Sequence, residues 1–577
     1  MLSGNQKNYI KIMPRVKKIL LINPFIIETN SYNYETVISG GQFAESPLGL
    51  GYISSYLQSK INDVEIEIFD ANLMAMKHFI SKGKVDMSAA WGLLKDKIEE
   101  VSPDIIGVSS LFHSTSHIVH QTCTLIKKIS PDIITVIGGS YPTISYSDAL
   151  KDNNIDYAII GEGEICFMDL ILFLNKEKGV ENLHGIAYRD DKNIIFKENK
   201  FLIKNLDELP FPDRTNISPD DYIMPNDFSE YGNLSRNFLF RVLGRNNAKI
   251  GIMTASRGCP YSCSFCSAKH IWGRSIRYRN SKNVVDEIEL LIKEYGVNAI
   301  VFNDDNFTVS TKKAVAIMDE IIKRGLNIRW GVGGGLGVNF LDEEIIKKMY
   351  DSGIAIFNLA FESGSQKTLK EIGKVLNLEI SKNVVRRIRK LGKGYIIGFF
   401  ISGFHFETKK EVEETLEFAR SLDLDWALIR NYQAIPGSRI FEECLQKGYI
   451  VADSIRYGYP LVTSNVDWPN FSKEYILEKN YLANLEVNFI NSRNLNSDRV
   501  DQAIRDFKGV IELAPDHAIA YYVLGKAYEI KGDLLKVKDN WHKAQDILKT
   551  SETSRSYFKH FKIDINKELN LLEGGAL

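Results

Sequence analysis

The stretch KIGIMTASRGCPYSCSFCSAK, residues 249–269, joins an apolar strand pattern to a cluster of three cysteines. Cys259, Cys263 and Cys266 have the spacing Cys-x3-Cys-x2-Cys. Full protein ligation of a 4Fe–4S cube needs four thiolates, so three thiolates leave one iron open to an outside ligand. A zinc ion with His270 as its fourth ligand is the alternative. The spacing alone leaves both kinds of metal site open.

The same strand starts a series of six strand–helix units. Helical patterns such as 283–295, 312–324 and 343–352 separate the apolar runs 249–254, 299–303, 328–332, 355–362, 394–403 and 426–433. Consecutive units of this kind predict a partial (β/α)6 barrel, and the chemistry of such a barrel lies at the carboxyl ends of its strands. We place this domain at residues 249–460, with the cysteines directly after its first strand.

An earlier series of apolar strands, at 17–25, 64–70, 104–110, 132–140 and 156–164, also alternates with helical patterns. This alternation predicts a parallel, doubly wound sheet at residues 17–200, after a tail at 1–16. Ligands of such sheets bind outside the carboxyl ends of the strands. The small and polar residues at these ends are Asn23, Asp70, Ser109, Ser110, Gly138, Gly139, Ser140, Gly161, Glu162 and Gly163. For each of them, ordinary turn chemistry is the alternative role.

Two further regions flank the barrel. Pro210 and Pro212 interrupt regular structure and indicate a linker at residues 201–248. Residues 461–577 have a helical pattern, and at about 500–550 this pattern repeats with a 34-residue period typical of tetratricopeptide repeats. The residues that carry the repeat are Ala503 and Val537, Phe507 and Trp541, Val510 and Ala544, with Leu524, Gly525 and Tyr528 at tetratricopeptide spacing. A helical cap without repeats is the alternative.

Composition and charge exclude several classes of protein. The 72 basic and 73 acidic side chains nearly cancel, which argues against a surface for nucleic acid. No apolar run reaches the ~18–20 residues of a membrane span, and the first residues lack a signal-peptide pattern. The six cysteines of a chain this long do not indicate a disulfide framework. The sequence therefore predicts a protein of the cytoplasm.

The cysteine stretch resembles the cluster motif of radical S-adenosylmethionine (radical SAM) enzymes, including the aromatic Phe265 before the last cysteine. In that family SAM binds the open iron, and its cleavage gives a 5′-deoxyadenosyl radical. The segments 303–308, 361–374, 399–408 and 434–441 also match the family, although His405 and Phe406 replace its usual Pro and Gly. The resemblance implies SAM contacts from Phe265, Asp304, Asp305, Glu362, Ser363 and Gly403. For the acidic residues, a helix N-cap or a solvated loop carboxylate is the alternative.

The glycine-rich stretch GVGGGLGVNF, residues 331–340, lacks the Lys-Ser/Thr of a P-loop. We interpret it as a close approach of backbone to SAM or substrate, or as tight packing.

The first domain is similar to the cobalamin-binding domain of cobalamin-dependent radical SAM enzymes. The segments 47–57, 105–110, 136–143, 155–164 and, in the linker, 206–214 match that family in order and spacing. The resemblance implies that the ten strand-end residues named above contact cobalamin. The Asp-x-His-x-x-Gly motif is missing, and His113 and His117 lack its context, which implies that no histidine binds cobalt. A flavin or a nucleotide is the alternative ligand.

The resemblance implies a methyltransferase that acts on an unactivated carbon of a small molecule through the deoxyadenosyl radical and methylcobalamin. One alternative is oxidation, cyclisation or rearrangement without methyl transfer, as in the anaerobic magnesium-protoporphyrin ester cyclase. A non-catalytic cobalamin-binding sensor or scaffold and a methylthiotransferase on tRNA are weaker alternatives. Expected partners are an electron donor such as flavodoxin or ferredoxin and a protein held by the C-terminal repeats.

Overall fold

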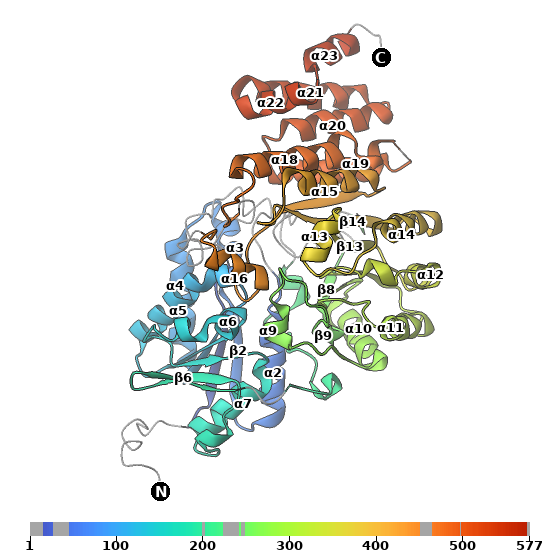
Figure 1. The fold of residues 1–577 in the computed structure, drawn as a ribbon. Coiled ribbons are helices and arrows are strands. Elements are labelled where there is room, and N and C mark those ends of the chain that lie inside the picture. Colours follow the sequence, from blue (N-terminus) through green and yellow to red (C-terminus); the bar gives the residue numbers. More distant parts are fainter. Residues whose placement is uncertain are drawn as a thin grey trace.

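The computed structural model describes residues 15–26, 45–198, 202–222, 242–243, 248–450, 464–496 and 498–573. Most of the expected tail at 1–16, most of the second half of the linker, and residues 451–460 at the expected end of the barrel lie outside these ranges. Figure 1 shows the first domain in blue to teal, the barrel in green to orange, and the C-terminal helices in orange to red above the barrel.

The first domain is built on a sheet with the strand order β2-β1-β3-β4-β5-β6-β7. Its first five strands run parallel, as β1 (Lys18–Asn23), β2 (Glu65–Asp70), β3 (Ile105–Ser110), β4 (Ile134–Gly139) and β5 (Tyr157–Ile159). The direction of progression reverses between β1 and β3, where a ligand crevice opens in flavodoxin-like sheets. The predicted doubly wound fold is confirmed for this domain.

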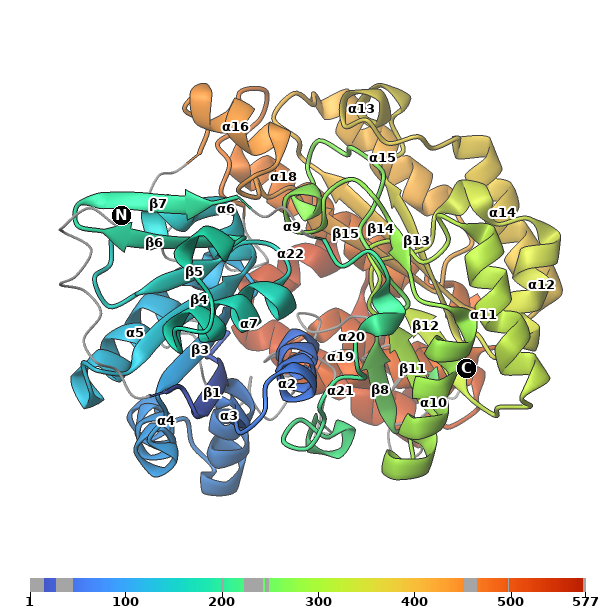
Figure 2. The same cartoon turned by 90° about the horizontal axis from the view of Figure 1, so that it is seen from below.

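Helices cover both faces of this sheet. They are α2 (Leu48–Lys60), α3 (Ala71–Lys82), α4 (Met87–Val101), α5 (Ser116–Ile129), α6 (Ser140–Ala149) and α7 (Gly163–Leu174). α3, α4 and α5 pack in series, whereas α2 packs against α7. Figure 2 shows α2 between the sheet and the barrel. A hairpin that was not predicted from the sequence, β6 (Ile186–Asp190) and β7 (Asn193–Lys197), extends the sheet with antiparallel pairing.

The second domain is an open barrel of six parallel strands. They are β8 (Ile250–Met253), β11 (Ala299–Phe302), β12 (Arg329–Val332), β13 (Ile356–Glu362), β14 (Tyr395–Ser402) and β15 (Trp426–Asn431). They form two three-stranded sheets, and parallel bridges from Trp330 to Ile354 and from Leu336 to Leu359 join these sheets. The predicted partial barrel is confirmed.

The barrel's covering helices alternate with its strands in the expected order. They are α10 (Ser281–Tyr295), α11 (Thr311–Lys323), α12 (Glu343–Asp351), α13 (Gln366–Glu371), α14 (Leu378–Leu391), α15 (Lys409–Ser421) and α16 (Arg439–Gln446). The loop that carries the cysteines contains the short helix α9 (Ala268–Trp272). A two-stranded ribbon, β9 (Ser256–Arg257) with β10 (Arg277–Tyr278), closes this loop at its base.

The C-terminal helices close the barrel at the amino ends of its strands. They are α18 (Lys473–Leu485), α19 (Val500–Leu513), α20 (Ala518–Ile530), α21 (Leu534–Thr550), α22 (Glu552–His560) and α23 (Ile565–Glu573). Phe489 and Phe507 share one apolar core with Ile250, Val301 and Trp426 of the strands. A Cβ on Gly525 in α20 would lie 2.2 Å from Nε1 of Trp541 in α21, so these two helices meet closely. Their assignment as tetratricopeptide repeats stays a prediction.

In the described part of the chain, no helix is both long and apolar enough to span a membrane.

Candidate functional site

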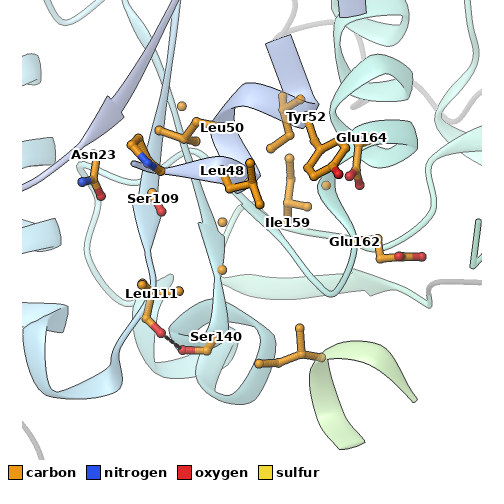
Figure 3. A pocket seen from close by; sticks show the side chains of 18 of the residues that line it. Asn23, Leu48, Leu50, Tyr52, Ser109, Leu111, Ser140, Ile159, Glu162 and Glu164 are labelled. Carbon is orange, nitrogen blue, oxygen red and sulfur yellow. Dashed lines mark hydrogen bonds between the residues drawn. The ribbon is translucent and has the colours of Figure 1, made fainter. Parts of the chain in front are cut away.

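A cavity of about 430 Å³ lies between the first domain and the barrel. Eight of the ten strand-end residues line it from the first domain: Asn23, Ser109, Gly138, Gly139, Ser140, Gly161, Glu162 and Gly163. The barrel contributes Thr254, Ser256, Arg257, Ile271, Trp272, Asn303 and Asp305. Figure 3 shows the first-domain side of this cavity, with Asn23 and Ser109 at one end and Glu162 and Glu164 at the other. The cavity therefore joins the carboxyl edge of the sheet to the cysteine loop.

The wall at the end of β4 is formed by backbone and small side chains. Gly139 has a φ of +107°, and a Cβ there would lie 2.5 Å from the carbonyl oxygen of Ser110. A Cβ on Gly138 would meet nothing closer than 3.9 Å. Ser140 Oγ donates to the carbonyl of Leu111, as the dashed line in Figure 3 marks. Such a wall allows a large ligand to approach the backbone closely.

Ser110 Oγ is a buried polar atom without a hydrogen-bond partner in the structure. The residue is only 1% exposed at the end of β3, next to the cavity-lining Ser109 and Gly139. A buried hydroxyl of this kind costs free energy unless a ligand or a water satisfies it. The small-residue wall and this hydroxyl fit a large cofactor with polar groups, as cobalamin is.

Asp70 is the other strand-end residue outside the cavity lining. Its carboxylate caps α3 by accepting from the Leu73 amide at 3.0 Å, and it accepts from the Tyr222 hydroxyl at 2.8 Å. Burial raises the pKa of Asp70 to about 6, against the opposing effect of these hydrogen bonds. Asp70 thus holds Tyr222 of the linker against the end of β2.

Neither His113 nor His117 belongs to the cavity lining. The His113 ring packs edge-on against Tyr141 with a centroid distance of 4.9 Å, and burial lowers the pKa of His113 to about 4. Tyr141 in turn makes a hydrogen bond of 2.9 Å with His120, whose other ring nitrogen lies 2.7 Å from Asp152. This chain of polar rings lies behind the cavity wall and was not predicted.

The cysteine loop is held from two sides. The Ser264 amide donates to the carbonyl of Ile372 at 2.9 Å, and the Ile440 amide donates to the carbonyl of Ser264 at 3.0 Å. The loop therefore lies between the end of α13 and the start of α16. Burial raises the pKa of the Cys263 thiol to about 11, and the charge of Lys374 opposes this rise.

Within the described ranges, no three His, Cys, Asp or Glu side chains converge closely enough to bind one metal ion. A 4Fe–4S cube does not require such convergence, since each thiolate binds a different iron. The three half-buried, disulfide-free cysteines on one short loop fit that donor set.

The adjacent carboxylates after β11 have different surroundings. Asp304 is 1% exposed and accepts from the Ala255 amide at 3.0 Å and the Ser256 hydroxyl at 2.5 Å. Burial raises its pKa to about 6. Asp305 lines the cavity and accepts from the Gly258 amide at 3.2 Å. Asp304 therefore positions the start of the cysteine loop, whereas Asp305 is open to a ligand.

Glu362 ends β13 in a strained conformation, with a φ of +65° in a residue other than glycine. A register shift between Ala360 and Glu362 re-aims its side chain, and Lys374 Nζ lies 3.1 Å from its carboxylate. Strain of this kind gathers at functional sites. Ser363 points elsewhere: it is fully buried and bonds Thr415 of α15 at 2.8 Å.

The turn after β14 forms even though His405 and Phe406 replace the usual residues. Gly403 has a φ of +89°, and the Glu407 amide donates to the Phe404 carbonyl at 2.9 Å. Glu407 itself accepts from the Gly403 amide at 2.7 Å, and burial raises its pKa to about 7. The Phe404 ring lies 6.1 Å from that of Phe265, which joins this turn to the cysteine loop.

The glycine-rich stretch packs against the loop after β11. A Cβ on Gly333 would lie 2.2 Å from Asn303 Oδ1, and one on Gly334 would lie 2.3 Å from the Asp304 carbonyl oxygen. These contacts match the tight-packing interpretation.

Of the residues predicted to contact SAM, only Asp305 lines the cavity.

The cavity also contains three residues that were not predicted from the sequence, Tyr52, Arg257 and Trp272. The Arg257 guanidinium lies 5.1 Å from the centre of the Tyr52 ring and 5.3 Å from that of Trp272. The position of Arg257 two residues before Cys259 was the one available signal.

Comparisons with known proteins agree with this geometry. Residues 253–419 match the radical SAM superfamily, and residues 37–171 match the B12 binding domain. An uncharacterised methyltransferase of Pyrococcus horikoshii is 28% identical over 81% of this chain and 92% of its own length. The cytidylyl-2-hydroxyethylphosphonate methyltransferase of Streptomyces wedmorensis is 29% identical over 77% and 84%. The anaerobic magnesium-protoporphyrin IX monomethyl ester cyclase of Rubrivivax gelatinosus is 27% identical over 74% and 70%.

A solved structure has the same fold. The cobalamin-dependent S-adenosylmethionine radical enzyme OxsB, with aqua-cobalamin and S-adenosylmethionine bound, superposes with a TM-score of 0.60 at 17% identity. The superposition covers 96% of this chain and 81% of that one.

The fold and the two domain matches define a radical SAM enzyme with an added B12-binding domain. The chain thus carries the two domains that cobalamin-dependent radical SAM enzymes combine, and its cofactors are a 4Fe–4S cluster, SAM and cobalamin. These two domain matches remove the zinc and flavin alternatives.

Proposed function

We propose that the protein transfers a methyl group to an unactivated carbon of a small molecule. The observation that carries this proposal is the cavity, because the predicted cobalamin-binding wall and the base of the cysteine loop line one space. A substrate in that space can face both cofactors at once. Cavities between domains with a few convergent polar groups are typical small-molecule sites.

When bound, the cluster with SAM supplies a radical that abstracts hydrogen, and cobalamin supplies the methyl group. In our proposal Cys259, Cys263 and Cys266 bind three irons and leave the fourth for SAM. Asp305 offers a carboxylate to SAM or the substrate in the cavity. The register shift in β13 directs the side chain of Glu362. This side chain and the turn at Gly403 would approach the cofactors from the ends of β13 and β14.

The first domain would hold cobalamin at the carboxyl edge of its sheet. Ser109, Gly138 and Gly139 would accommodate the cofactor against the backbone, and the Ser110 hydroxyl would gain a partner there. Tyr52 and Trp272 line the cavity, and their rings would help to exclude water from the reacting groups.

The relatives named as methyltransferases support methyl transfer. The cyclase from Rubrivivax gelatinosus favours a second candidate, a radical reaction without methyl transfer, because it covers nearly as much of the chain. Either reaction needs an electron from outside, and we propose a flavodoxin-like or ferredoxin-like donor. A protein partner of the C-terminal helices belongs to the same proposal.

Anaerobic reconstitution with iron, sulfide and cobalamin, followed by addition of SAM and reductant, tests the function. We expect 5′-deoxyadenosine together with S-adenosylhomocysteine, and we expect the second product to disappear when cobalamin is omitted. Cys263→Ala should abolish 5′-deoxyadenosine while leaving cobalamin binding unchanged. Formation of 5′-deoxyadenosine without cobalamin-dependent S-adenosylhomocysteine would favour the cyclase-like reaction instead.

A further inference from the structure

The ribbon at the base of the cysteine loop brings two like charges together. Arg257 in β9 pairs directly with Arg277 in β10 across the two antiparallel strands. Like charges directly opposite each other in such a pair are destabilising. The barrel by itself therefore contains an unfavourable contact at the point where the loop that carries the cysteines begins and ends.

The first domain supplies the countercharges. Glu162 accepts from Arg257 through Oε1 and from Arg277 through Oε2, both at 2.8 Å. Glu164 accepts from Arg257 at 2.6 Å. The exposed fractions of these side chains are 7% for Arg257, 9% for Arg277, 2% for Glu162 and 5% for Glu164. Two buried positive charges are thus balanced by two buried negative charges from the other domain.

The electrostatics of Glu162 agree with a tightly held carboxylate. Burial alone would raise its pKa, but the hydrogen bond from Arg277 and the charge of Arg257 outweigh burial and keep the pKa below its ordinary value. The amide of Ile203 donates to the same carboxylate at 3.0 Å. The side chain is fixed from three directions.

These four residues join the two halves of the site. Glu162 lies between Gly161 and Gly163 in the cavity wall, and Arg257 lies two residues before Cys259. Tyr52 of α2 and Trp272 of α9 further hold the Arg257 guanidinium by ring contacts. We propose that Arg257, Arg277, Glu162 and Glu164, here called the interdomain clamp, set the position of the cysteine loop relative to the cobalamin-binding wall. These are positioning residues, and only the catalytic consequence of the clamp rests on the proposed function.

The chemistry of the clamp makes it sensitive to small changes. Removing one member of a buried ion cluster leaves an uncompensated charge in the interior, which is strongly unfavourable. Glu162→Gln would leave Arg257 and Arg277 opposite each other with one countercharge. Arg257→Lys would keep the charge, but a lysine cannot hold two carboxylates in the fixed geometry of a guanidinium.

The chain offers a matched control on the other side of the barrel. Asp425 is 3% exposed and also bridges two arginines, Arg389 at 2.8 Å and Arg499. This bridge joins the barrel to the start of α19 and contains none of the cavity residues. Asp425→Asn therefore removes the same kind of charge without touching the cysteine loop.

Hydrogen exchange of the full chain without cofactors tests the clamp. We expect amides in residues 258–276 to exchange about tenfold faster in Glu162→Gln and Arg257→Lys than in the wild type, because local opening becomes easier. Asp425→Asn should leave these amides unchanged and speed exchange near its own bridge. Unchanged exchange of 258–276 in Glu162→Gln, or an equal increase in Asp425→Asn, would overturn the proposal.

Product ratios of the reconstituted enzyme give a second readout. In Glu162→Gln and Arg257→Lys, we expect the ratio of 5′-deoxyadenosine to S-adenosylhomocysteine to rise severalfold, because the two cofactors lose their alignment. Asp425→Asn should keep the wild-type ratio, and equal ratios in all variants would contradict a role of the clamp in the reaction. If the wild type itself makes no S-adenosylhomocysteine, the proposed function fails. The hydrogen-exchange experiment then still tests whether the clamp positions the cysteine loop.

Discussion

The barrel meets the first domain and the C-terminal helices through two very different contact surfaces. Toward the first domain, a cavity remains open and buried charges hold the two sides in place. Toward the C-terminal helices, Phe489 and Phe507 continue the apolar core of the strands. Apolar burial is strong but non-directional, whereas buried ion pairs act only in one geometry. The first surface thus positions a site, and the second stabilises the barrel.

Phe507→Ala is the largest expected perturbation of the stabilising surface. Phe507 is fully buried and stacks on Phe489 at 5.7 Å. Its truncation leaves a cavity, so we expect the free energy of unfolding to fall by ~3–5 kcal/mol. Urea titration measures this loss, and cobalamin titration of the folded variant should give the wild-type affinity. If Phe507→Ala bound cobalamin more weakly but kept its stability, the C-terminal surface would not have the purely stabilising role assigned to it.

Gly138→Ala is the reciprocal change at the positioning surface. The added methyl group would stand beside the cavity with no neighbour nearer than 3.9 Å, so the folded chain tolerates it. We expect cobalamin affinity to fall at least about tenfold, or ~1.4 kcal/mol, while the free energy of unfolding stays within about 0.5 kcal/mol of the wild type. Absorbance titration with cobalamin and urea unfolding give the two numbers.

Gly139→Ala serves as the contrast to that variant. Its φ of +107° and the 2.5 Å approach to the Ser110 carbonyl make a side chain strained there. We expect this variant to lose both stability and cobalamin affinity. If Gly138→Ala binds cobalamin like the wild type, the wall at the end of β4 is not the cofactor site.

His113→Gln gives an effect that depends on pH. Burial lowers the pKa of His113 from its ordinary 6.5 to about 4. Below pH 6.5 the unfolded chain binds a proton on His113, whereas the folded chain does not take it up until about pH 4. The contribution of neutral His113 to stability is therefore present above pH 6.5 and is lost as the pH falls toward 4. We expect the wild type to lose ~1–2 kcal/mol more than the variant between pH 7 and 4.5, after allowance for partial solvent screening. Urea unfolding at a series of pH values measures this difference, and an equal loss of stability in the wild type and the variant would contradict it.

The sequence predicted most of the fold because both domains depend on repeated local patterns. Apolar runs that alternate with helical periodicity define the strands of the first sheet and of the barrel. The hairpin of β6 and β7 and the two-residue strands β9 and β10 were missed, since such short or mixed segments carry no clear period. His405 and Phe406 did not prevent the expected turn, because Gly403 and Glu407 supply the backbone conformation and the hydrogen bonds it needs.

The candidate site was predictable in its location and less so in its individual contacts. Eight of the ten predicted strand-end residues line the cavity, because parallel strands bring their carboxyl ends to one edge. Asp304 and Asp305 are neighbours in sequence, and only the structure shows that one is buried in hydrogen bonds while the other faces the cavity. The clamp joins residues 93 to 115 positions apart, and no local pattern encodes such pairs.

Electron paramagnetic resonance of the reconstituted protein tests the central claim most directly, namely that one cavity joins both cofactors. The sample would be poised so that the cluster is reduced and cobalt is divalent, which makes both centres paramagnetic. Two such centres across a single cavity should show mutual line broadening and faster spin relaxation than samples that contain either cofactor alone. Spectra that equal the sum of the two separate samples would contradict the shared site.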